Sequence, residues 1–138
     1  NSRTDEIQAA ALRVKLPRLD IDNEHRRQIA RKYMNGIKNP MIILPLWPQD
    51  DQECVWHLFP IRCAERDSLQ KYLSEAGVQT LIHYPIAPHK QEALKHLEHG
   101  PLPLTQRIHE EELSLPISPI MTEDDAEFVI NLLNKFVK

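Results

Sequence analysis

The sequence predicts an α+β fold, a small sheet of about three or four strands with helices packed on one face. Segments with apolar residues at helical spacing interleave with short apolar runs that prolines or polar turns interrupt. The chain has 3 glycines, at positions 36, 77 and 100, and each follows a helical pattern. We expect each glycine to end a helix as a residue in the left-handed conformation.

The first two helices are expected within residues 1–36. One begins near Thr4 and ends or kinks at Pro17, because proline lacks the N–H that a helix interior needs. Its apolar stripe consists of Ile7, Ala10, Ala11 and Val14. The other helix runs from about Asp22 to Asn35. Its inward-facing residues are Ile29, Ala30 and Tyr33.

Apolar segments predict strands at residues 41–47, 53–63, 78–83 and 113–117. The second contains Pro60, which cannot donate to a ladder, so we expect it at an edge or facing away from a partner strand. Further helices are expected at 65–76, at 91–98 and from an N-cap at Thr105 to Glu111.

The last helix is expected to follow Thr122, with Asp125 in a position typical of a capping box. Its apolar face consists of Ala126, Val129, Ile130, Leu133 and Phe136. This face has the spacing of a helix that packs on a core.

The composition is ordinary for a globular domain: of 138 residues, 41% are apolar and 27% charged. A net charge of −3 does not favour nucleic acid as a partner. No apolar run approaches the ~18 residues of a membrane span, and no leader pattern is present. We therefore expect a cytoplasmic protein without a membrane partner. Cys54 and Cys63 are expected to be reduced thiols, too far apart along one strand for a disulfide.

Several kinds of active site are excluded by their missing motifs. The chain contains no G-x-S-x-G and no glycine-rich phosphate loop. Its 7 histidines keep a metal site as an alternative, but no H-E-x-x-H occurs and no carboxylate stands at ligand spacing from them. We expect no metal ligands. The histidines expected on solvated helix faces are His25, His96, His99 and His109.

The stretch TLIHYPIAPHK at 80–90 is the most informative local motif. Pro85 favours extended geometry at His83 and Tyr84, and a stiff backbone suits ligand contact because little ordering entropy remains to be lost. The alternative is that Tyr84 is a half-buried core ring and His83 a satisfied turn residue. The residues alone favour this alternative.

Blocks along nearly the whole chain resemble one family. NSRTDEIQAAALRVKLPRLD, QTLIHYPIAPHKQ and LSLPISPIMTEDD occur in the order and at the spacing typical of pyridoxal-phosphate-dependent nucleotide-sugar aminotransferases of the DegT/DnrJ/StrS type. Members that act on thymidine-diphosphate 3-keto-6-deoxyhexoses look most similar. WHLFPIR and RDSLQKYL also resemble their versions of these blocks.

The resemblance implies the C-terminal small domain of an aspartate-aminotransferase-like enzyme, at residues 37–138. Residues 1–36 would be the helices that connect it to a large domain, where the Schiff-base lysine lies. None of the 8 lysines here stands in a matching context, so the chain alone is expected to be inactive and to bind no pyridoxal phosphate covalently. The full-length enzyme would be a homodimer that moves an amino group from glutamate to a nucleotide-linked keto sugar.

The resemblance also implies roles for particular residues. Asn1 and Arg3 match a motif that reaches the cofactor phosphate of the neighbouring subunit. His83 and Tyr84, with His89 as a weaker match, correspond to residues near the sugar pocket. The alternative from another functional class is a non-enzymatic regulatory or interaction module that kept this fold.

Overall fold

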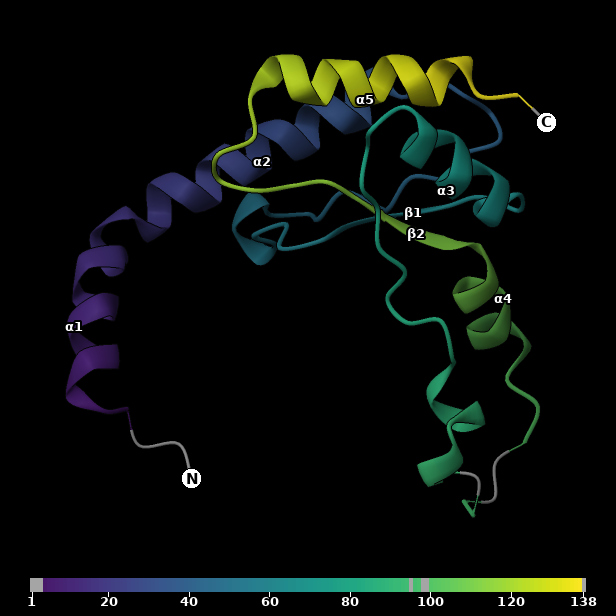
Figure 1. The fold of residues 1–138 in the computed structure, drawn as a ribbon, viewed down its shortest axis with the longest axis horizontal. Helices are drawn as coiled ribbons and strands as arrows, with labels where there is room; N and C mark the ends of the chain where they lie inside the picture. The colour runs from purple at the N-terminus through teal and green to yellow at the C-terminus, as the bar shows by residue number, and fades with distance from the viewer. Residues whose placement is uncertain (1–3, 95, 98–99, 138) are drawn as a thin grey trace.

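The computed structural model describes residues 4–94, 96–97 and 100–137. Its helices are α1 (Glu6–Lys15), α2 (Leu19–Gly36), α3 (Arg66–Glu75), α4 (Pro103–Glu111) and α5 (Glu123–Lys135), and its strands are β1 (Phe59–Arg62) and β2 (Glu112–Leu115). Short 3-10 turns are η1 (Leu16–Arg18), η2 (Asp51–Glu53), η3 (Pro88–Lys90) and η4 (Glu92–Leu94). Figure 1 shows a body of α2, α3, α5 and the two strands, from which two extensions project on the same side.

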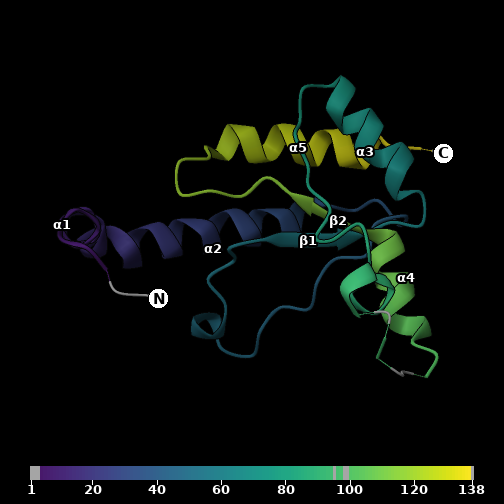
Figure 2. The ribbon, with the colours of Figure 1, turned by 60° about the horizontal axis from the view of Figure 1, so that its bottom comes forward.

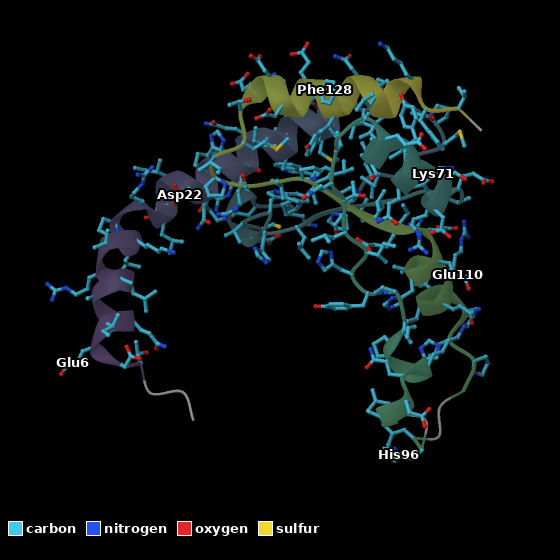
Figure 3. All side chains as sticks on the ribbon, in the orientation of Figure 1. Glu6, Asp22, Lys71, His96, Glu110 and Phe128 are labelled. Carbon is cyan, nitrogen blue, oxygen red and sulfur yellow. The ribbon has the colours of Figure 1, made fainter. Side chains whose placement is uncertain are left out.

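The first extension is α1, which continues through η1 into α2. Pro17 lies in η1, where the path changes direction, so the predicted interruption is confirmed. None of the residues of α1 is buried, and Ile7 and Val14 are 83% and 76% exposed. Figure 3 shows Glu6 at the far end of this extension. The stripe predicted from sequence therefore has no partner within the described residues.

The body is held together by α2 and α5. Ile29, Ala30 and Tyr33 of α2 are buried, as the periodicity predicted. The predicted apolar face of α5 is buried as well, and Thr122 and Asp125 form the expected capping box. In Figures 1 and 2, α3 and α5 lie on one side of the strands. The α+β class with helices against a small sheet is thus confirmed.

An asparagine from each side caps the C-terminal end of the other helix: Asn134 caps α2 and Asn39 caps α5. Asn134 of α5 donates to Gly36 O (2.9 Å) and accepts from Lys38 N (2.7 Å), at the end of α2. Asn39, which follows α2, donates to the carbonyl oxygens of Leu133 and Phe136, both at 2.8 Å. Carbonyls that a helix end leaves without partners are satisfied in this way.

The sheet has two strands in the described residues, β1 and β2, paired antiparallel with Phe59 opposite Leu115 and Arg62 opposite Glu112. The strands expected at 41–47 and 78–83 are reduced to single bridges, Ile43 with Arg62 and Leu81 with Ser114. Four segments therefore lie side by side, but only the inner two form a ladder.

Pro60 explains why pairing on one side stops. Arg62 N donates to Ile43 O (2.9 Å), and residues two apart in a strand direct their N–H groups to the same side. The backbone nitrogen of Pro60 therefore faces the 41–47 segment. Because this nitrogen carries no hydrogen, it cannot donate a further hydrogen bond that would extend the pairing. This agrees with the prediction that it faces away from a ladder partner.

Other expected boundaries were wrong. The strand expected at 53–63 begins only at Phe59, because η2 occupies its start and Trp56 has a positive φ of 50°. The helix α4 begins at Pro103 rather than after a cap at Thr105, in keeping with the preference of proline for the first turn. In place of the helix expected at 91–98, η4 is the described element, and residues 95, 98 and 99 lie outside the described residues.

The glycine prediction holds at one position. Gly77 has a φ of 84° after α3 and lies in the left-handed region. Gly36 and Gly100 do not have a positive φ. Gly36 instead stands at a close approach of two helices, since an added Cβ would lie 2.8 Å from Ile130 Cδ1.

Candidate functional site

The sheet carries its polar residues on the face away from the main core. In the register of β1 and β2, Phe59, Ile61, Leu113 and Leu115 share one face and belong to the apolar core. Glu112 and Ser114 of β2 project to the other face together with Pro60. Both polar residues are nevertheless buried, at 6% and 5% exposure. Buried polar groups on a strand require hydrogen-bond partners, and His83 supplies them.

His83 lies directly after the Leu81 bridge, beside these two side chains. Its backbone N–H donates to Glu112 Oε2 (2.8 Å), and its ring Nδ1 lies 2.9 Å from Ser114 Oγ. The Ser114 hydroxyl in turn donates to Glu112 Oε1 (2.6 Å). His83, Ser114 and Glu112 thus form a closed hydrogen-bonded triangle, which we call the His83 cluster. It holds both the backbone and the ring of His83.

Tyr84 is held by its backbone while its ring faces solvent. The carbonyl oxygen of Tyr84 accepts from His109 Nδ1 of α4 (2.8 Å). The side chain is 64% exposed and makes an edge contact with the His83 ring, with centroids 5.6 Å apart. The peptide bond between His83 and Tyr84 is cis. Within this chain the Tyr84 ring is therefore not half-buried, so that part of the alternative is wrong. The other part, that the hydrogen bonds of His83 are satisfied, agrees with its contacts to Glu112 and Ser114.

A small hollow of about 170 Å³ adjoins the His83 cluster, lined by residues that include His57, Gln79, Leu81, His83 and Ser114. A larger groove of about 770 Å³ lies along α5 and is lined by residues that include Leu81, Ile120 and Phe128. The second extension of the molecule contains η3, η4 and α4. Figure 3 shows Phe128 on α5, at the opposite side of the body from this extension, whose tip carries His96.

His89 lies in η3 and is partly buried. Asn1 and Arg3 lie outside the described residues. The structure brings together His83 and Tyr84 and adds Glu112, Ser114 and His109. The first two of these additions had a signal in the sequence, two polar residues at i and i+2 within a short apolar strand.

Two histidines were wrongly expected on solvated faces. His109 is partly buried and bonds the Tyr84 carbonyl, and His25 Nε2 bonds Met121 O at 2.7 Å. Both contacts join residues far apart in sequence, so helical periodicity gave no indication of them. His96 is exposed, as expected, and His99 lies outside the described residues.

A second polar cluster joins α2 to η2. Arg31 bonds Glu24 and Asp51, and these hydrogen bonds lower the pKa of both carboxyls. The buried Arg27 donates to the carbonyl oxygens of Asp51 (2.8 Å) and Cys54 (3.2 Å). Because these arginines of α2 bond to a carboxylate and to main-chain oxygens at η2, we infer that the cluster holds the η2 loop against α2.

The described lysines do not have the surroundings that a Schiff-base lysine needs. Lys15, Lys38, Lys71, Lys90 and Lys135 are exposed. Lys32 is partly buried, and desolvation acts to lower its pKa, but hydrogen bonds to Glu123 and Glu127 outweigh this and raise it. A Schiff-base lysine requires a depressed pKa in a preorganised pocket.

Within residues 4–94, 96–97 and 100–137, no group of three or more His, Cys, Asp or Glu side chains could hold a metal ion. Cys54 and Cys63 are free thiols. In the same residues, every helix is too short or too polar to cross a bilayer.

Known proteins match this chain over nearly its full length. A transaminase of Aneurinibacillus thermoaerophilus, named for dTDP-3-amino-3,6-dideoxy-alpha-D-galactopyranose, is 50% identical over 136 residues, which cover 99% of this chain and 37% of that protein. The erythromycin biosynthesis sensory transduction protein of Saccharopolyspora erythraea is 45% identical over 137 residues, with coverage of 96% and 37%. The chain therefore spans little more than a third of these relatives.

Solved structures agree with these matches. The crystal structure of S. venezuelae DesV superposes with a TM-score of 0.90 at 38% identity, covering 100% of this chain and 38% of that one. Residues 1–134 match the profile of the DegT/DnrJ/EryC1/StrS aminotransferase family. The match includes the segment with His83 and Tyr84 as well as both strands. On this evidence the chain belongs to the DegT/DnrJ/EryC1/StrS aminotransferase family.

Proposed function

We propose that this chain is the C-terminal small domain of a pyridoxal-phosphate-dependent aminotransferase that moves an amino group from glutamate to a nucleotide-linked keto-deoxysugar. Residues 1–36 are its connecting helices and residues 37–138 the small domain. The observation that carries the proposal is the 50% identity, over 99% of the chain, to a transaminase named for a dTDP-linked amino sugar. The name of that relative supports the proposed substrate class.

In this proposal His83 and Tyr84 contact the sugar nucleotide, with His89 nearby. The geometry supports this role, because hydrogen bonds from β2 and α4 hold both residues while the Tyr84 ring remains exposed. An exposed ring on a fixed backbone loses little conformational entropy when it binds a ligand. Its face can stack on a sugar or base, and its hydroxyl can make one hydrogen bond.

Pyridoxal phosphate supplies, when bound, an electron sink for the carbon that loses or gains the amino group. The described lysines do not fit its covalent attachment, so we assign that lysine to a large domain and derive no step through the cofactor here. Asn1 and Arg3 are proposed to contact its phosphate across the interface of a homodimer, since an amide and a guanidinium are apt donors to phosphate oxygens.

The absence of covalent cofactor from this chain can be tested directly. The 138-residue chain is mixed with pyridoxal phosphate, reduced with borohydride and weighed by mass spectrometry. We expect no stoichiometric adduct on a single lysine. One such adduct, located by peptide mapping, would overturn the assignment of the Schiff-base lysine to another domain.

The function is tested with the full-length protein. It is incubated with pyridoxal phosphate, glutamate and a dTDP-3-keto-6-deoxyhexose, and the amino sugar and 2-oxoglutarate are measured by mass spectrometry. We expect both products in equal amounts. Formation of 2-oxoglutarate without any aminated sugar, across a panel of keto-sugar nucleotides, would reject the substrate class.

A regulatory or interaction module is the second candidate. It is favoured by the 45% identity to a protein named for sensory transduction. The two candidates differ in what they require of the full-length protein. The enzyme needs a lysine that reacts with pyridoxal phosphate, whereas a module needs none. A full-length protein that neither binds the cofactor covalently nor forms 2-oxoglutarate would favour the module.

A further inference from the structure

The hydrogen bonds of the His83 cluster determine which ring nitrogen of His83 carries its hydrogen. A serine hydroxyl has a single hydrogen, and that of Ser114 is directed to Glu112 Oε1 at 2.6 Å. The contact of 2.9 Å between Ser114 Oγ and His83 Nδ1 then needs its hydrogen from the ring. A neutral imidazole protonated at Nδ1 has its lone pair at Nε2.

The direction of the Ser114 hydroxyl is itself fixed by burial of Glu112. This carboxylate is 6% exposed. The neighbouring arginines Arg62 and Arg107 form their ion pairs with Glu111 instead. The Ser114 hydroxyl donates to its Oε1 and the His83 backbone N–H donates to its Oε2. A buried carboxylate that loses a donor is left with an unsatisfied oxygen, which is costly. The hydroxyl therefore stays on Glu112 and accepts from His83.

We propose that Glu112 and Ser114 are positioning residues that keep His83 protonated at Nδ1, so that Nε2 accepts a hydrogen bond from a hydroxyl group of the sugar nucleotide. This inference rests on the proposed function for the identity of the ligand. His83 lines the small hollow beside β2, which gives a ligand group access to its ring. Ser114 lines the same hollow, whereas Glu112 is not among its lining residues.

The tautomer is measured without any catalysis. The full-length protein is labelled with ¹⁵N-histidine, and the His83 signals are assigned by their loss in His83→Gln. At about pH 8.5, where imidazole side chains are generally neutral, the ¹⁵N shifts and their couplings to ring protons distinguish the two tautomers. We expect Nδ1–H at His83. A predominant Nε2–H form in the unmodified protein would overturn the proposal.

Variants test the cause of that preference. Ser114→Ala removes the acceptor for Nδ1–H, so the Nε2–H form should become the major one, whereas Ser114→Thr keeps a hydroxyl and should keep the preference. Ser118→Ala is the matched control, because it removes a hydroxyl from the segment that follows β2 and should change nothing. An unchanged tautomer in folded Ser114→Ala would also overturn the proposal.

Kinetics connect the tautomer to the ligand. Ser114→Ala should raise KM for the keto-sugar nucleotide by about three- to tenfold, the effect of one weakened hydrogen bond, and should leave the half-reaction with glutamate unchanged. If the tautomer shifts but KM does not, His83 does not bind the sugar and the positioning proposal fails. If the full-length protein aminates no sugar at all, the proposed function fails while the tautomer measurement still stands.

Discussion

Ile130 of α5 fills the space beside Gly36 of α2. A Cβ at Gly36 would lie 2.8 Å from Ile130 Cδ1 and 3.0 Å from Ile130 Cγ2. Contacts under about 3 Å force one of the groups to move. The two helices thus pack closely because one position has no side chain, and the spacing of the body depends on it.

Gly36→Ala should therefore destabilise the domain by about 1–3 kcal/mol, the cost of an overpacked core. Gly100→Ala is the control, because nothing lies within 4 Å of a Cβ at that position and its φ is not positive. Chemical denaturation measures both. In a background of Ile130→Ala the penalty should disappear, and a penalty of equal size there would show that Ile130 is not its cause.

The cap of α5 should make stability depend on acid. The Thr122 hydroxyl donates to Asp125 at 2.6 Å, Thr122 N does so at 2.9 Å, and these bonds lower the pKa of Asp125 below its ordinary 3.8. A carboxyl whose folded pKa is depressed stabilises the fold above its unfolded pKa, and this stability is lost as pH falls through the folded pKa.

Thr122→Ala should cost about 1 kcal/mol near neutral pH, the usual value for an N-cap. The difference from the unmodified domain should shrink once the pH falls below about 4, as Asp125 becomes protonated. Thr122→Ser retains a hydroxyl and should behave like the original. Urea denaturation at a series of pH values measures this, and a difference that stays constant down to about pH 2 would contradict it.

Sequence reasoning succeeded where the signal is local. The periodicity of α2 and α5 and the Thr122–Asp125 cap depend on residues within a few positions, and the structure confirms them. Strand boundaries were less well predicted, because pairing joins distant segments and Pro60 limits it on one side. An apolar run alone does not show whether a neighbouring strand is available.

The candidate site shows the same difference between local signals, which the sequence carries, and contacts between distant residues, which it does not. Pro85 and the end of an apolar run made His83 and Tyr84 conspicuous, but the residues alone favoured a structural role. Only the family resemblance implied that they lie near the sugar pocket. Glu112 and Ser114 lie 29 and 31 positions from His83, so their hydrogen bonds could not be foreseen. The Tyr84 carbonyl contact with His109 spans 25 positions and was equally hidden.

The exposed stripe of α1 should cause the 138-residue chain to self-associate. Ile7 and Val14 are 83% and 76% exposed on a helix with no buried residue, and such surfaces usually serve contacts. The double substitution Ile7→Gln and Val14→Gln should weaken association at least tenfold, given roughly 1.5–3 kcal/mol for each buried side chain. Sedimentation equilibrium measures this, with Arg13→Gln as a control. A monomeric original chain over a wide concentration range would contradict it.

Asn1→Ala and Arg3→Ala should weaken retention of pyridoxal phosphate in the full-length enzyme. Loss of one charge-assisted contact to phosphate costs roughly 1.5–3 kcal/mol, which corresponds to about ten- to a hundredfold in affinity. Because the proposed contact crosses subunits, the loss should follow dissociation of the dimer. Cofactor affinity is measured by dialysis and absorbance at several protein concentrations. Unchanged affinity in both variants would remove these residues from the site.

Tyr84 should affect the sugar half-reaction alone. Tyr84→Phe in the full-length enzyme should raise KM for the keto-sugar nucleotide several-fold, since one neutral hydrogen bond contributes about 1 kcal/mol. Tyr84→Ala should raise KM further through loss of ring contact. Because the ring is 64% exposed, neither substitution should lower Tm appreciably, and the half-reaction with glutamate should stay unchanged. Stopped-flow measurement of both half-reactions, with a thermal melt of each variant, separates these effects. If both variants lose activity equally with glutamate and with sugar and also melt early, Tyr84 supports the fold of the enzyme instead of contacting its substrate.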